Sequence, residues 1–218
     1  MVGDGSFFTG PLLAEGWDSY DLNDWFVAPA SALTFNENVV TLRVRPSSPG
    51  RAPVVHTIPA GADLTLDVSA VTARRGTRIR IRRRDPGESI RIYGSMTPSS
   101  PDVWRQIAVM DPPHLAASVF RAVLLAKGIE VLGGVRSVDT PAASAVTARS
   151  LWAPVLAPEQ RGPRVLARHE SPPLLEYLEV VNKKSHNLFA ELILKTLGRV
   201  EEGEGSYDAG ARVVRRFL

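Results

Sequence analysis

Two polar side chains near the C-terminal end could serve one catalytic site: the hydroxyl of Ser185, which can relay a proton, and the carboxamide of Asn187, which can form orienting hydrogen bonds. A hydroxyl can pass a proton between a lysine and a leaving amine. An amide can donate to a substrate carbonyl and accept from a lysine. Residues i and i+2 of one helix point about 200° apart, whereas in an extended segment they share a face. The pair can therefore converge only in a connection between helices. The alternative is that both side chains merely cap helices.

The segments around this Ser-x-Asn triplet have helical patterns. Ser171-Pro172-Pro173 combines an N-cap residue with prolines and predicts a helix start. A second apolar helix is expected from Leu188 to Leu197, ending at Gly198, and a third from Tyr207 to Leu218. A strand is expected at 165–169. The first helix is expected to bury four apolar residues, namely Leu174, Leu175, Leu178 and Val181.

The preceding part of the chain is richer in β-forming residues. Alternating and β-branched runs predict strands at 33–44, 63–72, 105–110 and 129–135, and a β-hairpin whose strands, 78–82 and 89–94, flank a turn at 85–88. Asp111-Pro112 opens a helix expected at 112–127, which stops at Gly128. The fold class is therefore predicted as α+β, with a domain boundary near residue 163.

Composition excludes several kinds of site and partner. The chain of 218 residues has no cysteine, and its four histidines are scattered without metal-ligand spacing, so no metal or other cofactor is expected. A net charge of +3 is mild and indicates no nucleic-acid partner. No apolar run is long enough to span a membrane. The opening residues, 1–8, lack the basic and apolar regions of a signal peptide.

Two surface features leave alternatives open. Eight arginines crowd the predicted hairpin, between Arg74 and Arg91, as either an anion-binding face or the solvated side of a strand pair. No aromatic residues alternate with them, which argues against stacking of nucleic-acid bases. The four tryptophans are core or domain-contact residues in one interpretation and sugar-stacking residues in the other. They are Trp17, Trp25, Trp104 and Trp152.

Three segments carry a family resemblance: His169-Glu-Ser-Pro-Pro-Leu174, Val181-Asn-Lys-Lys-Ser-His-Asn-Leu-Phe-Ala-Glu191 and Thr196-Leu-Gly198. With the upstream Ala28-Pro29-Ala30-Ser31-Ala32-Leu33, they resemble the low-molecular-mass class C penicillin-binding proteins, the D-alanyl-D-alanine carboxypeptidase/endopeptidase family. Enzymes of this kind combine Ser-x-x-Lys, Ser-x-Asn and Lys-Thr-Gly signatures. Only Ser-x-Asn is in this chain: no lysine has a serine three residues before it, and in Lys195-Thr196-Leu197-Gly198 the extra leucine breaks the Lys-Thr-Gly pattern.

The resemblance implies a division of roles along the chain. Residues 1–163 would be part of a β-rich accessory insert, and residues 164–218 part of a transpeptidase-like catalytic domain. Ser185 would relay a proton and Asn187 would orient substrate and lysine, while His186 fills a variable position and is assigned no role. Lys183 and Lys184 match the family pattern but can equally be solvated or paired structurally.

The resemblance also implies an activity and a location. It implies a serine-type hydrolase that cleaves peptidoglycan stem peptides ending in D-Ala-D-Ala, binds β-lactams and works in the periplasm or at the cell wall. The chain is expected to be an internal fragment, inactive alone, since the nucleophilic serine is missing. The alternative is a non-catalytic module that binds wall polymer or protein. A class A β-lactamase fits poorly, because its corresponding insert is far too short. The residues do not predict an oligomeric state.

Overall fold

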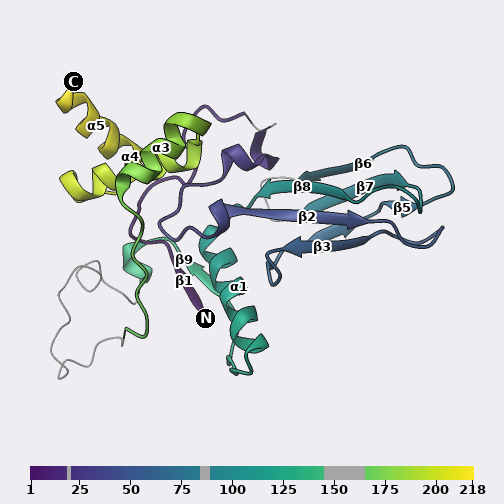
Figure 1. Cartoon of the computed structure of the whole chain (residues 1–218). Coiled ribbons are helices and arrows are strands. Elements are labelled where there is room, and N and C mark those ends of the chain that lie inside the picture. The colour runs from purple at the N-terminus through teal and green to yellow at the C-terminus, as the bar shows by residue number, and fades with distance from the viewer. Residues whose placement is uncertain (19–20, 84–88, 145–164) are drawn as a thin grey trace. The chain divides into compact units, whose positions relative to one another are not determined.

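The computed structural model describes residues 1–18, 21–83, 89–144 and 165–218. These residues form two compact units (Figure 1). The β-rich unit contains residues 1–3 and 12–137, and the helical unit contains residues 4–11 and 138–218. The boundary predicted near residue 163 lies outside the described residues and stays a prediction. The predicted α+β class is confirmed.

The β-rich unit contains a three-stranded antiparallel sheet in the order β3-β2-β8. Its strands are β2 (Val39–Arg45), β3 (Val54–Ile58) and β8 (Val103–Ala108). The alternation of β2 points Leu42 and Val44 inward, where both are fully buried, and leaves Arg43 on the opposite face. One face of this sheet therefore forms core, and the other meets solvent.

A second set of strands is centred on β7 (Ile90–Met96). It pairs in parallel with β4 (Leu66–Val68) and β5 (Val71–Thr72), and antiparallel with β6 (Ile79–Arg83). The β6–β7 pair confirms the strands of the predicted hairpin, and its turn at 85–88 lies outside the described residues. Ile90 and Ile92 of β7 are fully buried and belong to one cluster with Leu42 and Val44.

Helix α1 (Pro112–Ala126) completes this core with Leu115 and Val119, and confirms the helix predicted at 112–127. The Asp111 side chain accepts a hydrogen bond from the His114 backbone N–H at 2.9 Å, which satisfies one of the unpaired amides of the first turn. Gly128 follows the helix with a φ of +77°. The cap and stop residues therefore act as the sequence indicates.

Short elements fill the connections. The strands β1 (Val2–Asp4) and β9 (Arg136–Val138) pair with each other. The part of the chain that the structure describes also contains the 3-10 turns η1 (Asp21–Asn23), η2 (Trp25–Val27), η3 (Asn36–Asn38) and η4 (Pro141–Ala143). Two strand predictions need correction. The strand expected from residue 33 begins only at Val39, because all three residues of η3 have positive φ. The strand expected at 129–135 forms instead at 136–138.

The helical unit consists mainly of α3 (Leu174–Lys184), α4 (Asn187–Glu202) and α5 (Tyr207–Phe217) (Figure 1). The three predicted helices are therefore present. The strand expected at 165–169 is not formed, and those residues are exposed coil. The prediction that α3 buries its leucines is wrong: Leu174 and Leu175 are 57% and 68% exposed. Within the described part of the chain, their apolar face is not covered.

The sequence predicts that Gly198 ends its helix, and this prediction is wrong. Gly198 lies inside α4, where α5 packs against it. A Cβ at Gly198 would lie 2.7 Å from the backbone N of Gly210, and one at Gly210 would lie 2.1 Å from the backbone O of Leu194. No side chain fits at that separation, so these two glycines allow α4 and α5 to touch through their backbones. Helix α4 ends at Gly203, whose φ of +75° suits a C-terminal glycine.

Candidate active site

Ser185 lies in the connection between α3 and α4. It is the C-cap residue of α3, with φ 52° and ψ 49°, and its side chain is exposed. This left-handed conformation normally belongs to glycine or asparagine. In other residues it costs on the order of 1 kcal/mol and is concentrated at functional sites.

Asn187 is the first residue of α4 and is partly exposed. The helix before it has already ended at Lys184, so Ser185 and Asn187 do not lie on one continuous helix. The triplet therefore lies between two helices, as predicted, but it is not the extended segment that was expected, because Ser185 is left-handed and Asn187 is already helical. The convergence of the two side chains on one site stays a prediction. Both polar side chains reach the solvent-accessible surface, where a substrate could meet them.

His186, between the two, is the buried member of the triplet at 7% exposure. Its Nδ1 accepts a hydrogen bond from the backbone N–H of Phe189 at 3.4 Å, so it caps α4. Its ring stacks on the Phe189 ring, with centroids 4.1 Å apart and planes at 27°. Phe189 in turn packs edge-on against Tyr177 of α3 at 5.1 Å. Sequence analysis gave His186 no role, although a histidine that precedes a helix can act as a cap.

The two lysines before Ser185 are exposed at the end of α3. Lys183 Nζ forms an ion pair with Glu179 at 3.1 Å, one helical turn earlier. This matches the structural interpretation of Lys183, and Lys184 extends the basic last turn of the helix. Positive charge at a helix C-terminus is stabilising through the helix dipole. The ion pair and the helix dipole therefore account for both lysines without a role in substrate binding.

A buried cation, which sequence analysis missed, lies on α4. Lys195 is fully buried, and its Nζ donates to the backbone O of Pro11 at 2.9 Å. The ammonium also lies 4.7 Å from the ring centroid of Tyr207 and 5.5 Å from that of Phe8. Burial lowers the pKa of Lys195 to about 8, and the negative charge of Glu191 acts in the opposite direction. The sequence shows an apolar helix at 188–197, but it does not show that the lysine within this helix would be buried.

The Tyr207 hydroxyl donates to Glu191 Oε2 at 2.8 Å. Burial, and then this hydrogen bond, raise the pKa of Tyr207 well above its usual range. Around the same helices, the Thr9 backbone N–H donates to the Gly205 O at 2.9 Å, and the Arg199 guanidinium lies 5.2 Å from the Phe7 ring centroid. These contacts hold residues 4–11 against α4 and α5. Lys195 contributes to them through its hydrogen bond to Pro11.

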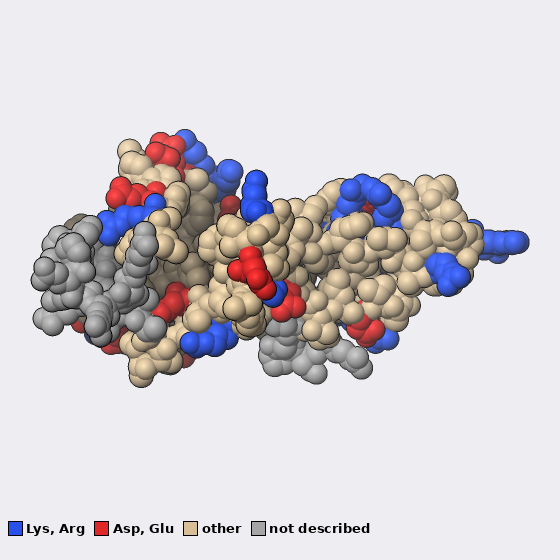
Figure 2. All heavy atoms as spheres, turned by 90° about the horizontal axis from the view of Figure 1, so that it is seen from below, with Lys and Arg blue, Asp and Glu red and all other residues tan. Residues whose placement is uncertain are grey.

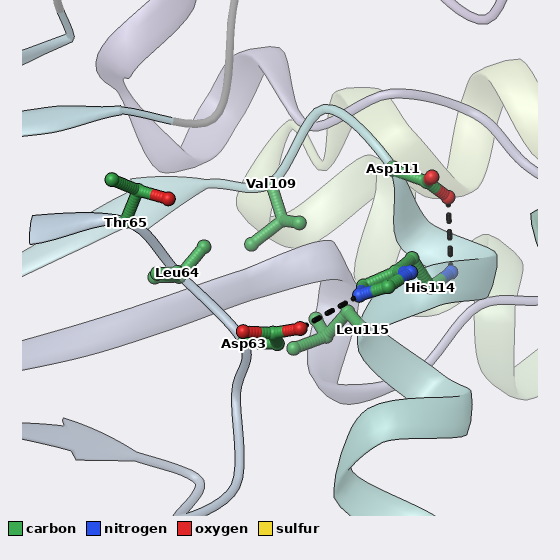
Figure 3. Close-up of a pocket in the computed structure, with 7 residues that line it drawn as sticks. All are labelled: Asp63, Leu64, Thr65, Val109, Asp111, His114 and Leu115. Atoms are coloured by element: carbon green, nitrogen blue, oxygen red, sulfur yellow. Dashed lines mark hydrogen bonds and ion pairs between the residues drawn. The ribbon is translucent and has the colours of Figure 1, made fainter. Parts of the chain in front are cut away.

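The β-rich unit has a hollow of about 300 Å³ that contains two aspartates and a histidine (Figure 3). His114 Nε2 lies 3.2 Å from Asp63 Oδ2. Asp111 already accepts from the His114 N–H and from the Ser137 hydroxyl, at 2.9 and 2.6 Å. Its oxygens therefore cap a helix and bind a neighbouring strand. The hollow also has the apolar side chains of Leu64, Val109 and Leu115 on its walls.

A second hollow, of about 400 Å³, lies on the outer face of the β2–β8 pair. In the antiparallel register Arg43 is opposite Trp104, and Thr41 is opposite Gln106, so these four side chains share one face. Trp104 and Trp25 are 54% and 42% exposed. The Arg43 guanidinium lies 4.9 Å from the Trp104 ring centroid. The exposure of Trp25 and Trp104 excludes a core role for these two, and leaves the domain-contact and sugar-stacking alternatives open.

Several arginines of the hairpin lie on its exposed face, an arrangement that both the anion-binding and the solvated-face interpretations require. Ile79 and Ile81 pack against the core, while Arg80 and Arg82 alternate with them and are exposed. Arg91 lies opposite Arg82 in the register and pairs with Asp67 at 3.8 Å. In the view of Figure 2, basic side chains form separate groups interrupted by other residues.

Within the described ranges, no group of three or more histidine, aspartate or glutamate side chains could hold a metal ion. None of the helices there is both long and apolar enough to cross a membrane.

Comparison with known proteins decides the family. The profile of the D-Ala-D-Ala carboxypeptidase 3 (S13) family matches residues 1–157 and 154–218. The chain belongs to this family. It is 28% identical, over 226 aligned residues, to the D-alanyl-D-alanine carboxypeptidase of Actinomadura sp. (strain R39), covering 100% of this chain and 39% of the relative. The resemblance noted in the sequence is thereby confirmed.

Solved structures show the same fold. Penicillin binding protein 4 (dacB) from Haemophilus influenzae matches with a TM-score of 0.72 at 21% identity, over 99% of this chain and 44% of that protein. Its complex with a β-lactam matches with a TM-score of 0.61 at 19% identity, over 88% and 41%. The chain therefore spans less than half the length of these relatives.

Proposed function

We propose that this chain is part of a serine-type D-Ala-D-Ala carboxypeptidase/endopeptidase that acts on peptidoglycan stem peptides. The observation that carries the proposal is the position of Ser185 and Asn187 in the α3–α4 connection of a family member. Ser185 passes a proton between a lysine and the leaving amine, and Asn187 orients the substrate carbonyl and that lysine. β-Lactams bind the same cleft, and the protein works in the periplasm or at the wall.

The nucleophile of this reaction belongs to a Ser-x-x-Lys segment that these 218 residues do not contain. The residues three positions before Lys127, Lys183, Lys184 and Lys195 are all apolar. Acylation requires that serine, since the proposed proton relay only assists its attack. We therefore expect the chain alone to neither hydrolyse D-Ala-D-Ala peptides nor form a covalent adduct with penicillin.

Covalent labelling tests both statements. The chain alone, incubated with penicillin, should keep its mass in intact-mass spectrometry. A longer polypeptide that adds Ser-x-x-Lys and Lys-Thr-Gly segments should gain the mass of one penicillin. In that polypeptide Ser185→Ala and Asn187→Ala should each slow acylation by on the order of 100-fold or more, the first by loss of the proton relay and the second by loss of orienting hydrogen bonds. A mass shift of the chain alone would refute the statement that the nucleophile lies outside these 218 residues. If the longer polypeptide shows no mass shift, the proposed activity is wrong.

A second candidate function, binding of cell-wall polymer without turnover, is favoured by the β2–β8 hollow. Exposed Trp25 and Trp104 offer flat apolar faces, while Thr41 and Gln106 offer hydroxyl and amide groups. Tryptophan fluorescence titrated with an N-acetylglucosamine tetrasaccharide tests it on this chain. Trp104→Ala should weaken binding by at least tenfold, whereas Trp17→Ala, outside the hollow, should not. Equal binding by wild type and Trp104→Ala would contradict this site.

A further inference from the structure

The middle residue of the triplet has a definite task in this geometry. We propose that His186 is a positioning residue, which holds Ser185 and Asn187 in place by capping α4 and by stacking on Phe189. This inference rests on the proposed function, because it concerns how the two proposed catalytic side chains are presented. It assigns His186 no contact with substrate. It predicts that the imidazole acts through the backbone on either side of it.

The first step is the cap. Nδ1 of His186 accepts from the Phe189 N–H at 3.4 Å. The His186 backbone O also accepts from the Ala190 N–H at 3.2 Å. Side chain and main chain thus satisfy two amides of the first turn of α4. Because Asn187 is the first residue of that turn, its backbone is fixed by the same contacts.

The second step is the aromatic stack. The His186 ring lies 4.1 Å from the Phe189 ring, which meets Tyr177 at 5.1 Å. Tyr177 belongs to α3 and Phe189 to α4, so the three rings link the helices that flank the triplet. Aromatic pairs add about 0.5–1.5 kcal/mol to the burial of their surface. The stack therefore constrains the angle at which α4 leaves α3.

The third step concerns Ser185. Its left-handed backbone is strained by on the order of 1 kcal/mol and persists only if its surroundings enforce it. The neighbouring His186 side chain is enclosed, at 7% exposure, whereas Ser185 is exposed. Ser185 cannot relax to an ordinary conformation without moving the buried imidazole. His186 is thus the residue that keeps the serine hydroxyl in its presented position.

Three substitutions separate the two contacts. His186→Asn keeps a cap acceptor but loses the stack, His186→Phe keeps the stack but loses the acceptor, and His186→Ala loses both. Ser206→Ala is the matched control, because the Ser206 hydroxyl caps α5 through the Ala209 N–H at 3.1 Å in the same unit. It removes a helix cap of similar strength without touching the triplet.

The chain alone supplies the first measurement. In His186→Ala, the Phe189 amide should exchange with deuterium at least tenfold faster, and the Ser185 Cα and Cβ chemical shifts should lose their left-handed signature. Ser206→Ala should leave both unchanged. His186→Asn and His186→Phe should each retain part of the Ser185 signature, because each keeps one of the two contacts. An unchanged Ser185 signature in His186→Ala would overturn the proposal whether or not the protein is an enzyme.

The second measurement uses the longer polypeptide described above. His186→Ala should lower the first-order acylation rate constant by roughly 10- to 100-fold with little change in β-lactam affinity, and the Asn and Phe variants should recover part of it. Ser206→Ala should lower the melting temperature but not this rate constant. If wild type acylates and His186→Ala matches it, the positioning role is wrong while the proposed function stands. If wild type does not acylate, the proposed function fails.

Discussion

Both units bury polar side chains, but among the described residues the buried ionisable ones, Lys195 and His186, lie in the helical unit. The core of the β-rich unit consists of aliphatic side chains such as Leu42, Ile90 and Ile92, which alternate along strands. The helical unit instead encloses Lys195 and His186, and brings α4 and α5 together at two glycines. An aliphatic core depends on filled volume, whereas the helical contacts depend on backbone approach and on polar partners. Substitutions should therefore destabilise the β-rich unit by creating cavities, and the helical unit by preventing close backbone contact or by removing polar partners.

The largest effect is expected in the aliphatic core. Ile92→Ala removes a fully buried side chain of β7 and should lower the free energy of unfolding by about 2–5 kcal/mol, through lost burial and a cavity. Urea denaturation followed by tryptophan fluorescence measures it. Ile58→Ala, at a position 46% exposed on β3, is the matched control and should change stability by much less. Equal losses at both positions would mean that β7 does not form a packed core.

Backbone approach should matter next, in the helical unit. A Cβ added in Gly210→Ala meets the backbone O of Leu194 at 2.1 Å, and backbone cannot move aside as a side chain does. We expect a loss of about 1–3 kcal/mol by overpacking, seen as faster hydrogen exchange across α4 and α5. Gly134→Ala adds the same atom where nothing lies within 4 Å, and should be near neutral. A stable Gly210→Ala variant would show that the helices do not pack this closely.

The buried lysine predicts a pH dependence of the helical unit. Burial lowers the pKa of Lys195 from 10.5 to about 8, so between these values the folded chain binds fewer protons than the unfolded chain. The free energy of unfolding should therefore rise with pH, by on the order of 1–2 kcal/mol between pH 7.5 and 9.5.

Lys195→Met isolates this contribution, because it retains an apolar stem and has no titrating group. Urea denaturation of both proteins at several pH values, followed by hydrogen exchange in α4, gives the comparison. The rise should be present in wild type and absent in Lys195→Met. The raised pKa of Tyr207 acts in the opposite direction, but only above its ordinary value of 10. A parallel pH dependence in the two proteins would contradict a desolvated lysine.

The smallest effect is expected on the exposed face of α3. Leu175→Ser replaces a side chain that is 68% exposed and should change the free energy of unfolding by no more than about 0.5 kcal/mol. Leu188→Ser, at 3% exposure on α4, should lower it by several-fold more. Thermal unfolding monitored by circular dichroism distinguishes the two. A large loss from Leu175→Ser would indicate that the face is covered in solution.

Local chemistry in the sequence predicted much of the secondary structure. The cap at Asp111, the alternation of the hairpin strands and the helical patterns around the triplet each depend on neighbours within a few residues. For the same reason the inter-helix position of Ser185 and Asn187 could be expected. Their catalytic roles remain proposals, since they depend on family membership and on residues outside this chain.

Tertiary structure decided the remaining features. Gly198 has the sequence context of a helix stop, yet only the packing of α5 shows why a glycine lies there. Leu174 and Leu175 have the pattern of a buried stripe, yet a pattern cannot show whether another segment covers it. The enclosure of Lys195 requires Pro11, which is distant in sequence. Periodicity encodes which face of an element is apolar, whereas the neighbour of that face is set by contacts between distant segments.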